Sequence, residues 1–167
     1  LCMFMATLFL SISKKSIIHF MESKDLILEN VIDKLLVTMN TKAVIFDLDG
    51  TLIDNNSYHL KTWKIYLEKA GMNISEEAYR KNINGRTNKD ALEYIYNKKM
   101  TNDEAMVYAL EKEALYRDLY QSDIKPVKGL IRLLECIHER NIPVAIATSG
   151  IQVNIDFMFE HIPIRHY

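Results

Sequence analysis

The chain has 167 residues, a formal net charge of −1 at pH 7 and an apolar fraction of 49%. This length allows one modest domain or a small core with an insert, and the apolar content excludes a disordered chain. Because the charge is near neutral and no basic block is present, nothing in the bulk electrostatics points to a nucleic-acid partner, and we expect none. Cys2 and Cys136 lack metal-ligand spacing, so we expect a reducing, cytoplasmic environment, with Cys136 on the buried side of a helix.

Residues 1–38 are expected to form an N-terminal extension, either outside the native protein or accessory to it. Residues 2–12 are apolar, but no positively charged segment precedes them and they are too few to span a bilayer as a helix. We therefore expect no membrane anchor. Met39 stands just before the first core strand and is the expected native start, although helical periodicity in residues 22–36 leaves a structured extension open.

Two carboxylates follow the first core strand. Residues 43–46 form an apolar run typical of a strand covered on both faces, and Asp47 and Asp49 come directly after it. One carboxylate there can attack phosphorus and form an aspartyl-phosphate, while the second transfers the proton. Charge repulsion between carboxylate and phosphate calls for a divalent cation, and Mg²⁺ suits this role. Gly50 permits the turn whose N–H groups can bind an anion.

A second apolar strand ends in hydroxyl groups. Residues 141–147 lead into Thr148, Ser149 and Gly150. Short hydroxyl donors and free N–H groups suit phosphate oxygens, although this tripeptide alone is an ordinary turn. Paired with the first strand, it predicts a phosphate site.

The run Asp47-Leu48-Asp49-Gly50-Thr51 resembles the first signature of the haloacid dehalogenase-like phosphohydrolases. The resemblance covers most of residues 41–167, and residues 54–71 resemble the β-phosphoglucomutase and phosphatase branch with a helical cap. It implies that Asp47 is the nucleophile and a magnesium ligand. It also implies that Asp49 is the general acid and base, binding Mg²⁺ through its main-chain carbonyl. Thr148, with Ser149 and Gly150 beside it, is the implied phosphate-binding residue of the second signature.

Helical segments separate the two signatures, and no strand is evident between them. Capping residues precede these segments: Asn56 or Ser57, Ser75, Thr87 and Thr101. We therefore expect an α/β fold, with an incomplete Rossmann-like parallel sheet core of the haloacid dehalogenase type and an inserted α-helical cap. The expected core comprises residues 39–56 and 123–167, and the expected cap comprises residues 57–122.

The resemblance implies that the substrate meets six residues of the cap: His59, Trp63, Gly85, Arg86, Thr87 and Asn88. Each has a plain structural alternative. Trp63 can anchor the core, His59 can begin a helix with a satisfied hydrogen bond, and Arg86 can be a solvated charge. The mutases of this family carry an arginine at the position held here by Asn88, which favours a phosphatase over a mutase.

The family also uses a later lysine and a later acidic pair, which lie beyond the span of these residues. We therefore interpret the chain as C-terminally truncated, with a sheet of two strands and at best weak activity. The complete protein is expected to be a monomer acting on a small phosphorylated metabolite, without a nucleic-acid or membrane partner. A non-catalytic remnant with a binding cap stays an alternative. A phospho-acceptor signalling module is disfavoured, because such a module would not carry a helical insert after its first acidic strand.

Overall fold

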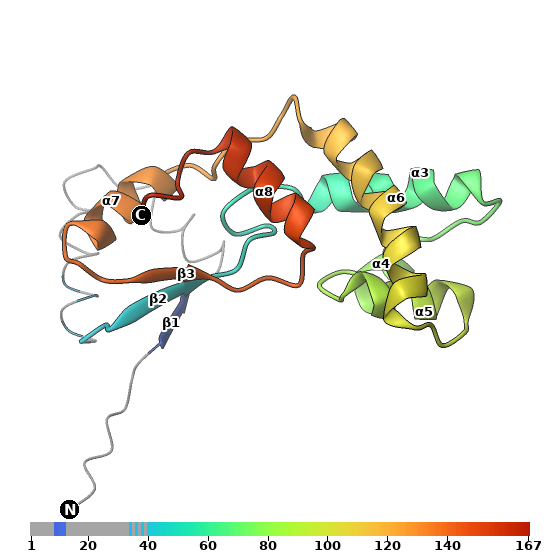
Figure 1. Ribbon diagram of the computed structural model, residues 1–167, viewed down its shortest axis with the longest axis horizontal. Coiled ribbons are helices and arrows are strands. Elements are labelled where there is room, and N and C mark those ends of the chain that lie inside the picture. Colours follow the sequence, from blue (N-terminus) through green and yellow to red (C-terminus); the bar gives the residue numbers. More distant parts are fainter. Residues whose placement is uncertain (1–8, 13–33, 35, 37, 39) are drawn as a thin grey trace, which may run out of the picture. The chain divides into compact units, whose positions relative to one another are not determined.

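The computed structural model describes residues 9–12, 34, 36, 38 and 40–167 (Figure 1). The chain divides into two compact units. The sheet unit contains the described residues up to Asp54 together with Lys125–Thr148 and Ile162–Tyr167. The helical unit contains Asn55–Ile124 and Ser149–His161. None of the helices in the described part of the chain has the length and hydropathy needed to cross a bilayer.

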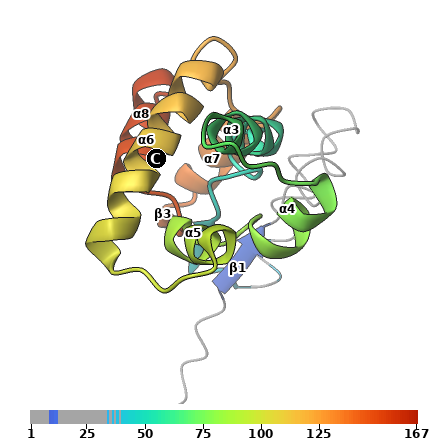
Figure 2. The same ribbon diagram turned by 90° about the vertical axis from the view of Figure 1, so that its right-hand side faces the viewer.

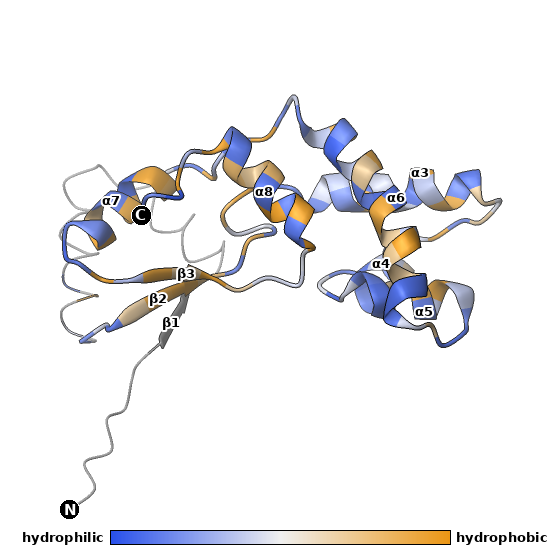
Figure 3. Ribbon diagram, viewed as in Figure 1, coloured by the Kyte–Doolittle hydropathy of each residue, from blue (hydrophilic) through white to orange (hydrophobic). Residues whose placement is uncertain are grey.

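The sheet unit is built on three parallel strands, β1 (Phe9–Ile12), β2 (Ala43–Phe46) and β3 (Val144–Ile146). Their order is β1-β2-β3, and the register pairs Ile45 with Ala145. Central placement explains why Val44 and Phe46 are fully buried. Figure 3 shows the apolar character of β2 and β3. The expected α/β fold with a parallel sheet is confirmed.

The expectation of a two-stranded sheet is wrong, because β1 comes from the N-terminal extension and pairs with β2. A two-stranded sheet would leave one edge of β2 with unpaired N–H and C=O groups, and β1 satisfies them. Leu36 of the same extension is buried, and its carbonyl accepts a 3.1 Å hydrogen bond from the Thr41 amide. Apart from Lys34 and Leu36, the helical periodicity expected over 22–36 lies outside the described residues.

Helix α7 (Leu130–His138) completes the described core of the sheet unit. It begins directly after Gly129, which adopts a left-handed conformation with φ of 77° and separates Val127 from the helix. Cys136 is buried on the inner side, as expected. Ile131 instead lies on the outer side, where 37% of it is exposed.

The helical unit contains five helices: α3 (Asn56–Lys69), α4 (Glu76–Asn82), α5 (Asn88–Tyr96), α6 (Asn102–Tyr120) and α8 (Gln152–His161). The long helix α6 packs against α3, α5 and α8 (Figure 2). Four of these helices fall between β2 and β3, as predicted. Helix α8 comes from the segment expected to belong to the core, yet it groups with the helical unit.

Three of the predicted helix caps are confirmed. The hydroxyls of Ser75 and Thr87 accept hydrogen bonds from the Ala78 and Asp90 amides, and Thr101 forms a capping box with Glu104. The cap predicted for α3 is wrong. This helix begins at Asn56, one residue after Asn55, which makes no side-chain capping bond. The Asn55 side chain is instead buried inside the unit, where it donates a hydrogen bond to the Tyr116 hydroxyl.

Candidate active site

Asp47 and Asp49 lie at the carboxyl end of β2, on either side of the buried residue Leu48. The Leu48 amide donates a 2.8 Å hydrogen bond to Asp47 Oδ1. Burial raises the pKa of the Asp47 carboxyl, the Leu48 hydrogen bond opposes this rise, and the charge of Asp49 adds to it. The charge of Asp49 therefore disfavours the ionised form of Asp47, and a bound cation would relieve this repulsion.

A tight turn after these carboxylates fixes their backbone. The Leu48 carbonyl accepts hydrogen bonds from three successive amides, those of Thr51, Leu52 and Ile53, at 3.2, 3.0 and 3.4 Å. Gly50 has a φ of 69°, so the turn uses the left-handed region that glycine adopts at little cost. Leu52 also accepts a 2.9 Å hydrogen bond from the Val127 amide. The predicted glycine turn is confirmed.

The end of β3 lies beside this turn. The Ala147 amide donates a 2.8 Å hydrogen bond to the Phe46 carbonyl, directly before Asp47. Because β2 and β3 are parallel, Thr148 follows its strand at the same edge of the sheet as Asp47. The sheet unit thus brings the predicted nucleophile and the predicted phosphate hydroxyl together. Ser149 and Gly150 belong to the helical unit, which the chain enters after Thr148.

Trp63 lies in the interior of the helical unit, and His59 is half-buried in the same unit. The His59 ring stacks on Tyr116, with centroids 4.2 Å apart and planes 3° apart, and its Nε2 lies 3.2 Å from Asn55 Nδ2. Asn55 Nδ2 also donates a 2.7 Å hydrogen bond to the Tyr116 hydroxyl. Trp63 is only 3% exposed. Its ring packs edge-on against the Tyr66 ring, so Trp63 is part of the core of this unit, in agreement with its structural alternative.

The loop from Gly85 to Asn88 has a mainly structural arrangement. Gly85 has a φ of 74°, and Thr87 accepts a hydrogen bond from the Asp90 amide and donates one to its carboxylate. Asn88 Nδ2 donates a 2.9 Å hydrogen bond to Glu113 Oε1. Contact of these residues with a substrate stays a prediction.

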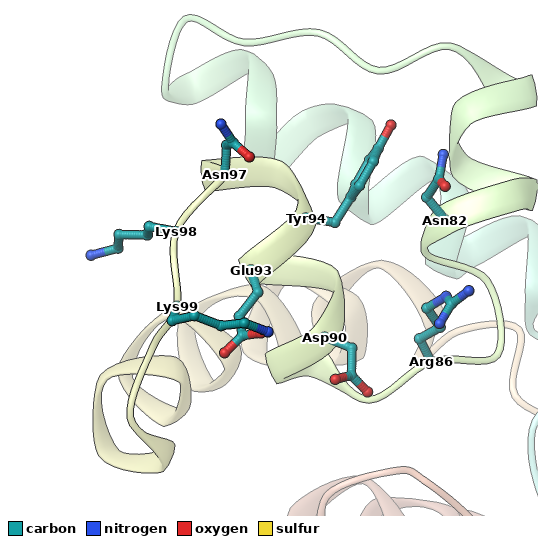
Figure 4. A pocket seen from close by; sticks show the side chains of 8 residues that line it. All are labelled: Asn82, Arg86, Asp90, Glu93, Tyr94, Asn97, Lys98 and Lys99. Atoms are coloured by element: carbon teal, nitrogen blue, oxygen red, sulfur yellow. The ribbon is translucent and has the colours of Figure 1, made fainter.

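Arg86 lies on a polar surface of the helical unit and is exposed. It lines a cavity of about 490 Å³, and Figure 4 shows the surrounding side chains, which are Asn82, Asp90, Glu93, Tyr94, Asn97, Lys98 and Lys99. Among these lining residues, Lys99 forms a 2.7 Å ion pair with Glu93. Side chains of both charges are typical of a solvated surface, which agrees with the alternative that Arg86 is a solvated charge.

Sequence reasoning missed a buried ion pair on α6. Lys112 Nζ lies 2.5 Å from Glu113 Oε1, and both side chains are almost fully buried. Lys112 Nζ also lies 4.9 Å from the centroid of the Trp63 ring. A signal was present, because these two charges fall among Ala105, Ala109 and Tyr116, which lie on the inner face of the same helix.

The donors at the end of β2 suit Mg²⁺. This cation binds through one or two carboxylates and keeps several waters, so it needs no dedicated protein cage. Asp47 supplies a carboxylate and Asp49 supplies a main-chain carbonyl in the expected assignment. Within the described residues no three His, Cys, Asp or Glu side chains gather into a cluster able to hold a metal ion.

The family model for haloacid dehalogenase-like hydrolases matches residues 44–167, which include both strand ends described above. The chain belongs to this family. A haloacid dehalogenase-like hydrolase of family IA, variant 3, from Entamoeba histolytica is similar, with 39% identity and a TM-score of 0.67. This similarity covers 76% of the present chain and 57% of the Entamoeba chain.

Two enzymes of known activity are also similar. Fructose-1-phosphate phosphatase of Escherichia coli is 25% identical over 125 residues, which are 75% of this chain and 65% of that enzyme. The β-phosphoglucomutase of Bacillus subtilis is 31% identical over 118 residues, which are 65% of this chain and 51% of that enzyme. The chain therefore spans less than two thirds of the length of either enzyme.

Proposed function

We propose that the protein is a magnesium-dependent phosphatase that hydrolyses small phosphate esters, such as sugar phosphates, through an aspartyl-phosphate. The proposal depends mainly on one observation, the arrangement of Asp47, Asp49 and Thr148 at neighbouring strand ends of a haloacid dehalogenase-like hydrolase. The phosphatase relatives support phosphate-ester hydrolysis. Mg²⁺ would be held by the Asp47 carboxylate and the Asp49 carbonyl, and when bound it offsets the charge of the phosphoryl group.

The reaction follows from two carboxyl groups with different tasks. An oxygen of Asp47 attacks phosphorus, the bond between phosphorus and the leaving oxygen breaks, and the protonated Asp49 carboxyl gives its proton to that oxygen. In the second step Asp49 takes a proton from water, which attacks phosphorus and displaces the Asp47 carboxylate. Thr148 would donate a hydrogen bond to a phosphoryl oxygen, and N–H groups of the Gly50 turn would assist it.

A sugar-phosphate mutase is the second candidate. The identity to the Bacillus β-phosphoglucomutase favours it. Asn88 counts against it, because its side chain donates to Glu113 and it stands where the family resemblance expects an arginine. A non-catalytic remnant with a binding cap stays a third alternative. In each case the proposed partner is a small phosphorylated metabolite in the cytoplasm, bound by a monomer whose helical unit acts as the cap.

The proposal is tested by replacing the nucleophile in the full-length protein. Asp47→Asn keeps the shape of the side chain and removes the attacking charge, so phosphate release from sugar phosphates should fall by at least about 10³-fold. Asp118→Asn, an exposed carboxylate on α6, is the matched control and should leave turnover unchanged. Unchanged turnover in the Asp47 variant would end the proposal, and net transfer between two positions of one sugar would favour the mutase.

A further inference from the structure

Glu113 joins three helices of the helical unit through one buried carboxylate. Its Oε1 accepts hydrogen bonds from Lys112 Nζ at 2.5 Å and from Asn88 Nδ2 at 2.9 Å. Its Oε2 accepts a 2.8 Å hydrogen bond from Asn154 Nδ2 of α8. Burial by itself raises the pKa of Glu113, but Lys112, His59 and Asn154 outweigh it and lower the pKa. The carboxylate is therefore ionised and needs all of its donors.

Asn154 uses both ends of its amide to hold α8 against α6. Besides the bond to Glu113, its Oδ1 accepts a 2.9 Å hydrogen bond from Arg117 Nη1. Glu113 and Arg117 lie one turn apart on α6, so the two bonds fix both the position and the rotation of α8. The side chain of Asn154 is buried, so water competes little for these bonds. A shift of α8 along α6 would break them together.

The chain connects this arrangement to the predicted phosphate loop. Helix α8 begins two residues after Gly150, and the Asn154 amide closes its first turn onto the Ile151 carbonyl at 3.0 Å. Ser149 and Gly150 belong to the same unit as α8. At the other end of the network, Asn88 donates its hydrogen bond to Glu113. It is the first residue of α5 and directly follows the loop that contains Arg86.

We propose that Asn154 and Glu113 couple the predicted phosphate loop at the start of α8 to the loop before α5, which is predicted to contact the substrate. Phosphate bound at Ser149, which belongs to the same unit as α8, fixes the start of this helix. Asn154 passes this constraint to Glu113, and Glu113 fixes Asn88. Asn154 and Glu113 are positioning residues, since neither touches the reacting atoms. The inference rests on the proposed function and deepens it by naming the residues that link phosphate binding to substrate choice. Because such coupling is reciprocal, a change at either loop alters binding at the other.

The test measures inorganic phosphate binding to the full-length protein by calorimetry with Mg²⁺ present. Asn154→Ala and Asn88→Ala should each weaken phosphate binding by about three- to tenfold, and the double variant should bind no more weakly than the weaker single variant. In the reverse direction, Asn154→Ala should change the ratio of KM values between a sugar phosphate and a small aryl phosphate more than it changes kcat. A merely structural role predicts equal losses for both esters.

Thr101→Ala is the matched control, because it removes the N-cap of α6 without touching Glu113. It should lower the melting temperature yet leave phosphate affinity and the KM ratio unchanged. If Asn154→Ala does not fold, Asn154→Asp replaces it, since it keeps the acceptor for Arg117 and opposes Glu113. Multiplicative effects in the double variant, or unchanged phosphate affinity in Asn88→Ala, would overturn the coupling. A wild-type protein that neither binds phosphate nor hydrolyses esters would instead refute the proposed function, and the coupling with it.

Discussion

Carboxylates of the two units have opposite electrostatic environments. At the end of β2, partial burial of the Asp47 carboxyl together with the Asp49 charge outweighs its backbone hydrogen bond and raises its pKa. On α6, Glu113 is buried, and Lys112 with its other donors lowers its pKa. A carboxylate with surplus negative charge around it is prepared for a cation or for chemistry, whereas a fully bonded carboxylate maintains the structure. This contrast separates the proposed reactive site from the hydrogen-bonded network around Glu113.

Breaking the buried pair should have the largest effect on stability. Glu113→Ala leaves the Lys112 ammonium buried without its counter-charge, so we expect a loss of about 3–5 kcal/mol in the free energy of unfolding. Chemical denaturation measures this loss. The double variant Lys112→Met with Glu113→Leu removes both charges and should recover most of it. A single variant as stable as the wild type would contradict the contrast drawn above.

Deleting residues 1–38 should have the next largest effect, because it removes β1. The exposed edge of β2 would then offer unpaired backbone groups, so we expect a lower melting temperature and concentration-dependent association. Thermal unfolding and light scattering measure both. If a protein starting at Met39 melts like the full-length form and stays monomeric, β1 contributes nothing to the sheet. That result would support the expectation that residues 1–38 lie outside the native protein or are accessory to it.

The sequence predicted the features that depend on neighbouring residues. Ser75, Thr87 and Thr101 cap their helices because a hydroxyl needs only the amide three residues later. The strand before Asp47 was recognisable because its apolar run and glycine turn are contiguous.

Features that depend on distant partners were missed. Strand β1 pairs with a segment more than thirty residues later in the chain, and a short apolar run does not reveal its partner. The burial of Lys112 and Glu113 requires donors from α5 and α8, which no local pattern supplies. The extra bonds of Asn154 likewise explain why α8 groups with the helical unit although its sequence follows β3.

Acid should change the contributions of Glu113 and Asp47 to the stability of the fold in opposite directions. Glu113 has a lowered pKa, so its stabilising contribution is present above its unfolded pKa and is lost as the pH falls through its folded pKa. Asp47 has a raised pKa, so its charge destabilises the fold near neutral pH and protonation relieves this. Melting curves from pH 7 to about pH 2.5 should show Glu113→Gln below the wild type at neutral pH and Asp47→Asn level with it or above. Both differences should shrink in acid.

Loss of a helix cap should have the smallest effect on stability. Thr101→Ala removes the capping box of α6 and should cost about 1 kcal/mol, because the bonded amide of Glu104 then relies on water. Thr101→Ser keeps the hydroxyl and should be close to wild type in chemical denaturation. Equal losses in the two variants would indicate that packing of the threonine methyl group, rather than the cap, stabilises this end of the helix.

The most direct test of the central claim is to locate a phosphoryl group on the protein. In the full-length Asp49→Asn variant, attack by Asp47 can proceed on an ester with a good leaving group, while activation of water is impaired. Acid quenching with magnesium and an aryl phosphate, followed by mass spectrometry of peptides, should therefore find phosphate on Asp47. The Asp47→Asn variant should carry none. Phosphate on another residue, or turnover without any trapped phosphoryl group in either variant, would contradict the assignment of Asp47 as the nucleophile.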